Sequence, residues 1–138
     1  MSYRHLEHST DAFIEVKAKN LEEAFSVAGK SVVETIIDLE NIQEIEEKSI
    51  KVKGRNLLNL LYNWLEEIVT ITITDGFAIK KFSVNIKKNT EYEIVSKVSG
   101  EKLDLKKHNF KIEIKSPTFH LMEIKENDEI TMQYLLDL

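Results

Sequence analysis

Hydrophobic and polar residues alternate along several stretches of the chain, and a period of two residues predicts β-strands. In the first such stretch, residues 12–18, every even-numbered position is apolar, whereas Glu15 and Lys17 lie on the opposite face. A second stretch places Ile50 and Val52 between lysines and ends at a glycine. Each of these strands is therefore expected to bury one face and to expose the other.

Apolar residues recur every three or four positions between these strands, and this spacing predicts a helix over residues 21–38. Asn20 is a suitable N-cap for this helix, and Glu23 follows at the spacing of a capping box. The apolar face of the helix would then pack against the strands and supply part of the core.

A second helix is predicted to begin after the N-cap Asn56 and to continue to Thr74. Its apolar stripe consists of Leu57, Leu60, Leu61, Trp64, Leu65 and Ile68. Residues 69–74 are β-branched throughout, which favours a strand by propensity. We nevertheless assign them to the helix, because Ile71 and Thr72 continue its stripe and no turn-forming pair precedes them.

In the rest of the chain, apolar and polar residues alternate as they do in β-strands. Five are predicted, over residues 77–87, 91–99, 110–114, 119–125 and 130–138. The last two are separated by a turn-forming run and should form a hairpin. The order of elements predicts an α+β fold in which two helices pack on one face of a mainly antiparallel sheet. Residues 1–138 contain no linker-like stretch and are expected to form a single domain.

Composition narrows the classes of function. The chain has 138 residues and no cysteine, which excludes disulfides, thiolate metal sites and cysteine nucleophiles. Its net charge is -5, with acidic and basic residues interleaved, so we do not expect it to bind nucleic acid unaided. A basic protein partner suits this charge better. No apolar stretch approaches the ~20 residues needed to span a bilayer, and we expect a soluble cytoplasmic protein.

Two acidic residues that lie far apart in the sequence are candidates for metal binding. Asp137 ends the last predicted strand beside Leu138, and Asp11 precedes the first. If these residues meet, two like charges about 4 Å apart repel by roughly 4 kcal/mol at an effective dielectric constant of about 20. Carboxylate oxygens without thiol or imidazole ligands favour Ca²⁺, Mg²⁺ or Mn²⁺ over zinc. The alternative is that Asp11 caps a turn and that Asp137 belongs to a frayed terminus.

The histidines offer less specific chemistry. His5 and His8 have the spacing of a zinc-binding pair on a helix, but their surroundings are strand-like, which separates the rings. We favour instead a hydrogen bond between His8 and Asp11 that orders the loop. His120 could act as a general base beside a metal cluster, or it could be a structural residue, which we favour. His108 follows two lysines and is expected to be solvated.

Several motifs, taken in their order, resemble those of the archease family. Residues 8–12 (His-Ser-Thr-Asp-Ala) are similar to the family's His-Thr-Ala-Asp motif, and residues 137–138 (Asp-Leu) are similar to its Asp-Ile ending. Residues 115–120 (Lys-Ser-Pro-Thr-Phe-His) resemble its Lys-Ala-x-Thr-Tyr-His motif, with Phe119 where tyrosine is common. Both predicted helices and the Gly100-Glu101 loop also resemble family signatures, so the resemblance covers essentially the whole chain.

The resemblance implies a strand-helix-strand-strand core with inserted strands and a function that is not enzymatic. Archeases are accessory proteins that activate the GTP-dependent tRNA-splicing RNA ligase by promoting its guanylylation and multiple turnover. The resemblance also implies a divalent-metal site formed by Asp11, Asp137 and the main-chain oxygens of Leu138. Ca²⁺ is the expected ion, with Mg²⁺ and Mn²⁺ as alternatives.

Two further functions stay open at this point. The resemblance connects such proteins with chaperoning of a tRNA cytosine methyltransferase, a role that would need no metal. A metal-dependent phosphohydrolase is disfavoured, because the sequence does not offer both a nucleophile and a leaving-group acid. For contact with the ligase, the candidate residues are His8, Lys115, Thr118 and His120.

Overall fold

A computed structural model of the protein describes residues 2–6 and 11–138. This part of the chain forms seven strands, two α-helices and one short π-helical segment. The elements are β1 (Ser2–Leu6), β2 (Asp11–Ala18), α1 (Leu21–Ile36), β3 (Glu46–Gly54), α2 (Leu57–Val69), η1 (Thr70–Thr74), β4 (Phe77–Lys88), β5 (Tyr92–Lys102), β6 (Ser116–Glu126) and β7 (Ile130–Asp137).

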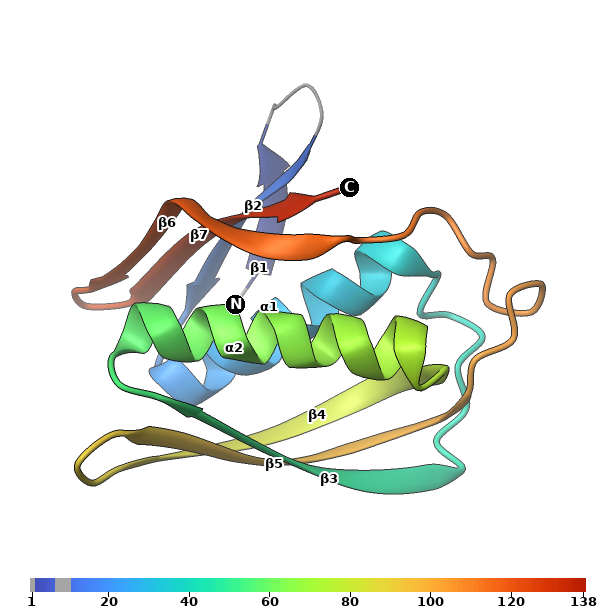
Figure 1. Cartoon of the computed structure of the whole chain (residues 1–138), viewed down its shortest axis with the longest axis horizontal. Helices are drawn as coiled ribbons and strands as arrows, with labels where there is room; N and C mark the ends of the chain where they lie inside the picture. The colour runs from blue at the N-terminus through green and yellow to red at the C-terminus, as the bar shows by residue number, and fades with distance from the viewer. Residues whose placement is uncertain (1, 7–10) are drawn as a thin grey trace.

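The strands form two antiparallel sheets, with strand orders β1-β2-β7-β6 and β3-β5-β4, and Figure 1 shows both helices in the layer between them. The predicted α+β class and the antiparallel pairing are confirmed. The expectation of one sheet with helices on one face needs correction, because the strands divide between two sheets. The reason lies in α1, which buries nine of its 16 residues, more than a single stripe. A helix that is buried on two sides requires a layer on each side.

Both helices begin where the capping residues predict. The side-chain oxygen of Asn20 accepts a hydrogen bond from the Glu23 N–H at 2.9 Å, and the Glu23 carboxylate accepts one from the Lys19 N–H at 3.3 Å. Asn56 accepts a bond of the same kind from the Asn59 N–H at 2.8 Å. These side chains satisfy N–H groups that the first helical turn leaves without an intrahelical partner.

The helical assignment of the β-branched run is confirmed, although its last turn differs from an α-helix. Residues Thr70–Thr74 continue α2 as η1, a π-helical segment in which Ile71 and Thr72 are buried. The Thr72 hydroxyl donates to the Ile68 carbonyl at 2.8 Å. Burial therefore overrides the strand propensity of these residues. The helix stops at Gly76, whose φ of +65° is readily adopted only by glycine.

One predicted strand is absent, and another begins at a different residue. Residues 110–114 form no strand, and the N–H of Lys111 instead donates to the carbonyl of Ile36 at 2.8 Å, at the end of α1. β6 begins at Ser116, earlier than expected, and includes Pro117. The N-terminal strand β1 was not among the predicted strands, although the surroundings of His5 were described as strand-like. It pairs with β2, where Tyr3 lies opposite Val16.

Two buried hydrogen bonds fix the positions of the helices. The indole N–H of Trp64 in α2 donates to the carbonyl of Phe25 in α1 at 2.8 Å, and so links the two helices. The hydroxyl groups of Ser31 in α1 and Tyr134 in β7 form a short hydrogen bond that links α1 to the four-stranded sheet.

Among the described residues, no helix is long and apolar enough to cross a membrane.

Candidate functional site

Asp11 and Asp137 lie directly opposite each other, at the first residue of β2 and the last residue of β7. Their strand neighbours Ala12 and Leu136 are buried in the core, so the two aspartates belong to the outer face of the sheet. Directly opposed residues of this kind have Cβ atoms about 4.5–5.5 Å apart. The fold therefore places the two predicted metal-binding carboxylates side by side.

The third strand fixes the position of Asp137 from the other side. Ser116, the first residue of β6, lies opposite Asp137, and the N–H of Lys115 donates to the carbonyl of Asp137 at 2.8 Å. Leu138, which follows, is partly buried and packs against the hydrophobic core. The end of β7 is thus held by strands on both sides and by an apolar anchor.

A bulge in β6 shapes the surface next to the two aspartates. The pairing of β6 with β7 is interrupted between Thr118 and Glu123. Within the interruption, Leu121 has a φ of 61°, and its carbonyl accepts a hydrogen bond from the Gln133 amide at 2.9 Å. The Thr118 hydroxyl accepts a bond from the N–H of His120 at 3.1 Å. This geometry leaves the His120 side chain exposed to solvent.

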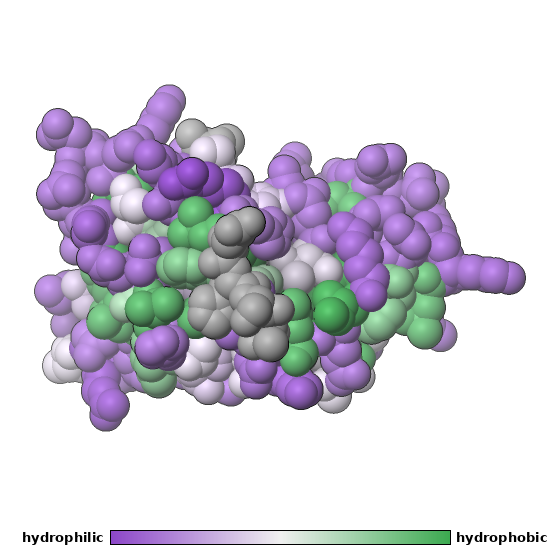
Figure 2. All heavy atoms as spheres, turned by 90° about the horizontal axis from the view of Figure 1, so that it is seen from above, coloured by the Kyte–Doolittle hydropathy of each residue, from purple (hydrophilic) through white to green (hydrophobic). Residues whose placement is uncertain are grey.

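An open hollow of about 610 Å³ joins these features. Its lining includes Asp11, Asp137, Thr118 and His120, four of the residues that sequence analysis selects. On its rim, Phe119 is 53% exposed. Figure 2, which looks down on this side of the molecule, shows apolar groups exposed among hydrophilic ones.

The predicted site residues can now be placed one by one. Asp11, Asp137, Thr118 and His120 line the hollow, and Lys115 and Leu138 are sequence neighbours of its lining residues. His8 lies outside the described residues, so its predicted contact with Asp11 is not addressed. Sequence analysis did not select Tyr62 of α2, which also lines the hollow, because helical spacing alone does not show where its ring lies.

The carboxylate pair fits a hard divalent cation in the chemistry of its donors. In residues 2–6 and 11–138, no three His, Cys, Asp or Glu side chains are grouped so as to hold a metal ion. The register places two carboxylates opposite each other, those of Asp11 and Asp137, with Ser116 opposite Asp137 on the other side. Mg²⁺ is commonly held by one or two carboxylates and completes its shell with water or phosphate oxygens. The donor set fits an ion that is held in this way. Ca²⁺, the expected ion, takes about six to eight oxygen ligands and would need further donors, such as the main-chain oxygens of Leu138.

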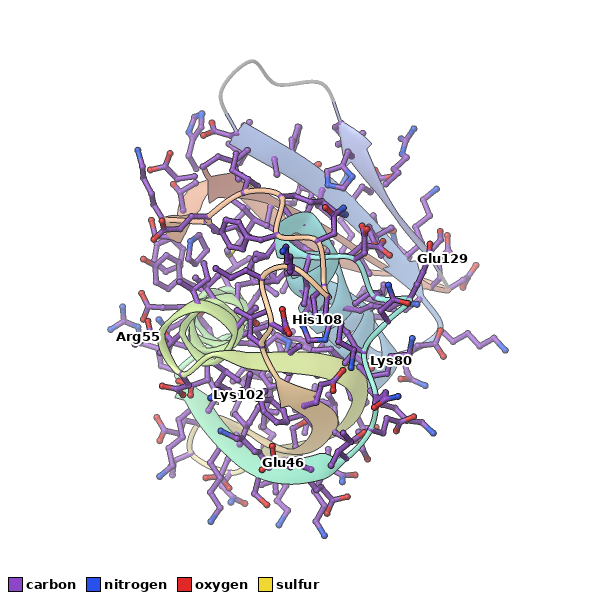
Figure 3. The ribbon with its side chains drawn as sticks, turned by 90° about the vertical axis from the view of Figure 1, so that its right-hand side faces the viewer. Glu46, Arg55, Lys80, Lys102, His108 and Glu129 are labelled. Carbon is purple, nitrogen blue, oxygen red and sulfur yellow. The ribbon has the colours of Figure 1, made fainter. Side chains whose placement is uncertain are left out.

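A second polar cluster, at the end of β5, is buried rather than solvated. His108, which was expected to be exposed, is fully buried and is visible inside the molecule in Figure 3. Its Nδ1 accepts a hydrogen bond from the N–H of Asp104 at 3.0 Å, so the proton of the neutral ring lies on Nε2. Nε2 then donates to Glu101 at 2.9 Å.

Glu101 is the centre of this second cluster and is only 8% exposed. Lys107 Nζ lies 2.9 Å from both carboxylate oxygens, and the N–H of Gln43 donates to one of them at 2.8 Å. The Lys107 ammonium, followed by the hydrogen bonds from His108 and Gln43, lowers the pKa of Glu101 to about 2. Because Asp38 donates its N–H to the His108 carbonyl at 2.9 Å, the cluster ties three segments together. We assign it a structural role.

Comparison with known proteins agrees with this architecture. The model of the Archease protein family (MTH1598/TM1083) matches residues 3–138. Protein archease of Pyrococcus abyssi is 35% identical over 125 residues, which cover 90% of this chain and 88% of the relative. Protein archease of Pyrobaculum islandicum is 34% identical over 141 residues, covering 100% and 96%.

A solved structure extends the similarity to the fold. The solution structure of Methanobacterium thermoautotrophicum protein 1598 superposes with a TM-score of 0.84 at 29% identity, covering 99% of each chain. The family resemblance inferred from the motifs is confirmed by these matches, and the chain belongs to the archease family.

Proposed function

We propose that this protein activates a GTP-dependent tRNA-splicing RNA ligase by promoting guanylylation of the ligase, and so allows multiple turnover. Membership of the archease family supports an accessory, non-catalytic role in tRNA processing. The observation that carries the finer proposal is the pairing of Asp11 with Asp137 on an exposed sheet end. Guanylylation consumes a nucleoside triphosphate, and its phosphates are the groups that such a site would meet.

In this proposal Asp11 and Asp137 hold a divalent cation between them, and the main-chain oxygens of Leu138 complete the ligand set that the family resemblance implies. The ion, when bound, supplies positive charge to phosphate oxygens. The chain's own contribution is rigidity, because β2 and β6 flank Asp137 and the Lys115 N–H holds its carbonyl. Sites built on paired strands keep their geometry better than sites on loops. The acidic pair is thereby presented at a fixed place on the surface.

The surroundings of the acidic pair are suited to docking on a protein. Phe119 is 53% exposed, and its ring stacks on that of Tyr62 at the edge of the hollow. A rigid, exposed aromatic group is the type of residue that anchors protein interfaces. Lys115 and His120 are exposed beside it, and Thr118 is half-buried. We assign these residues to contact with the ligase.

The test is a multiple-turnover ligation assay with the host's own ligase and substoichiometric amounts of this protein. Asp11→Asn and Asp137→Asn keep the size of the side chains but remove their charge. We expect both variants to lose stimulation of ligase guanylylation. Asp128→Asn is the matched control, since Asp128 is exposed in the turn at the opposite end of the same hairpin. Full stimulation by both site variants would exclude the proposal.

A second candidate function is favoured by a separate observation. Three large apolar side chains on one segment are exposed, namely Leu105 at 60%, Phe110 at 39% and Ile112 at 40%. Exposed apolar groups of this kind can cover an aggregation-prone partner. This protein would then act as a chaperone of a tRNA cytosine methyltransferase. Light scattering of the methyltransferase, with and without a chelator, separates the two functions, because only ligase activation is expected to need metal.

A further inference from the structure

The outer face of the three-stranded sheet is unusually rich in lysine. Ile50 and Val52 point into the core, so alternate residues of β3 point outward, and the register extends this face across β5 and β4. Twelve residues in four rows make up this face. Five of them are lysines, namely Lys51, Lys53, Lys81, Lys87 and Lys97. We call it the lysine face.

Nothing in the described part of the chain covers the lysine face. Figure 1 shows both helices on the other side of this sheet, and all five lysines are exposed. In the part of the chain that the structure describes, the ion pairs of Lys97 and Lys53 are long, at 3.9 Å to Glu47 and at 4.0 Å to Glu91. Within residues 2–6 and 11–138, Lys51 and Lys87 have no ion pair. Their positive charges are therefore available to a binding partner.

The composition of the lysine face indicates the class of partner. Apart from the lysines and two glutamates, it carries serine, asparagine and one apolar residue, Val95. Protein interfaces concentrate aromatic and aliphatic groups at their centre and are depleted in lysine. Lysine, serine and asparagine are residue types that contact nucleic-acid phosphates. The concentration of lysine is also local, because the whole chain has a net charge of -5.

We propose that the lysine face contacts the phosphate backbone of RNA, and this inference rests on the proposed function in tRNA ligation. The contact is confined to one end of the sheet. Near β5 Ser99, the glutamates at positions 44, 46 and 47 outnumber the two nearby lysines, Lys81 and Lys97. The Ser99 hydroxyl also donates to Glu44 at 2.8 Å. The opposite end carries three of the five lysines, Lys51, Lys53 and Lys87, against one outward glutamate, Glu93, which lies between Lys53 and Lys87. The RNA path therefore follows this end.

The contribution of this face is an auxiliary one. Phosphate contacts give affinity without sequence specificity, and the overall negative charge of the chain opposes them. The protein alone is thus expected to bind RNA only at low salt, and the lysine face adds to RNA binding that the ligase supplies. The net charge led to the expectation that the chain does not bind nucleic acid unaided, and the proposed contact accordingly acts mainly in the complex with the ligase.

The test compares two double charge reversals. Lys51→Glu with Lys87→Glu changes the lysine face, whereas Lys17→Glu with Lys125→Glu makes the same charge change on the outer face of the other sheet. Binding of fluorescently labelled single-stranded RNA is measured by anisotropy at about 50 mM salt, for the protein alone and for its complex with the ligase. We expect the lysine-face variant to bind at least about fivefold more weakly. Its salt slope should fall by about 1.4, because two lysines no longer neutralise RNA phosphates. The control should stay within about twofold of wild type.

Equal losses in both variants, or no contribution of the wild-type protein to RNA binding in either setting, would overturn the inference. Guanylylation of the ligase without RNA is measured in parallel. It should be unchanged in the lysine-face variant, and a loss there would make this face a docking surface for the ligase instead. If the wild-type protein does not stimulate guanylylation at all, the proposed function fails, whereas the anisotropy comparison still decides whether the lysine face binds RNA.

Discussion

The ring of Phe119 lies flat against the ring of Tyr62, with the centroids 4.3 Å apart and 11° between the planes. This contact joins the bulge of β6 to α2 at the edge of the hollow that contains the two aspartates. It also fixes one face of an exposed aromatic side chain and leaves the rest of the ring to solvent.

Replacing Phe119 by alanine should therefore affect partner binding more than folding. An aromatic pair contributes about 0.5–1.5 kcal/mol beyond its buried area. Because the buried part of the ring is lost as well, we expect the free energy of unfolding to fall by at least that amount. The concentration of this protein that half-maximally stimulates the ligase should rise. Phe119→Tyr keeps the stacked ring and is the control. If Phe119→Ala leaves the half-maximal concentration unchanged, the pair of Phe119 and Tyr62 is not part of the surface that binds the ligase.

The buried glutamate at the end of β5 predicts a loss of stability in acid. Since its neighbours lower the pKa of Glu101 from 4.5 to about 2, the ionised form is favoured in the folded state. The stability that this group contributes is fully present above pH 4.5 and is lost as the pH falls toward 2. Glu101→Gln should thus unfold more easily at neutral pH and lose less stability than wild type over this interval.

Urea unfolding at about pH 7, 4.5 and 3 measures the effect for Glu101. Glu113→Gln is the control, because Glu113 is exposed and makes no ion pair among the described residues. Parallel pH dependence of the Glu101 variant and the wild type would show that the cluster around His108 does not hold a charged carboxylate.

The hydroxyl pair between α1 and β7 predicts a change at alkaline pH. The Ser31 hydroxyl donates to the Ala28 carbonyl at 2.7 Å, so the Tyr134 hydroxyl is the donor to Ser31. Burial raises the pKa of Tyr134, which means that the neutral form is favoured in the folded state and that its contribution is lost only at high pH. One of the four tyrosines should therefore ionise only when the protein unfolds.

Ultraviolet titration of the phenolate absorbance counts the tyrosines that ionise before unfolding. In Tyr134→Phe, the late ionisation should disappear and the free energy of unfolding should fall by about 0.5–1.5 kcal/mol, the usual contribution of one hydrogen bond. Tyr92→Phe, at a half-buried position at the start of β5, should retain the late step. If the late ionisation persists in Tyr134→Phe, it belongs to a residue other than Tyr134.

Sequence information was sufficient where structure depends on near neighbours. Asn20 and Asn56 mark the helix starts because a cap acts over three residues. The turn at Gly76 is equally local. Asp11 and Asp137 were brought together through the resemblance of their motifs to those of a known family, since no local signal links the two ends of the chain.

Structural features that depend on contacts between distant residues could not be predicted in the same way. Residues 110–114 alternate like a strand, but the Lys111 N–H is bound by Ile36 and no neighbouring strand is available among the described residues. His108 follows two lysines, yet it is buried because Glu101 and Asp104 satisfy both ring nitrogens. The division of the strands into two sheets depends on burial of α1 from two sides, which residue spacing indicates only weakly.

The pairing of Asp11 with Asp137 predicts that divalent cations stabilise the protein in the absence of any partner. A ligand that binds only the folded state adds about 2.7 kcal/mol to the free energy of unfolding at about 100 times its Kd. Thermal unfolding with Ca²⁺, Mg²⁺ or Mn²⁺, after chelator treatment, should therefore show a higher Tm for the wild type. Asp11→Asn and Asp137→Asn should each remove the shift, whereas Asp128→Asn should keep it. If the Asp11 and Asp137 variants respond to the ions as the wild type does, the cation is bound elsewhere, and the role of the carboxylate pair reduces to direct contact with the ligase.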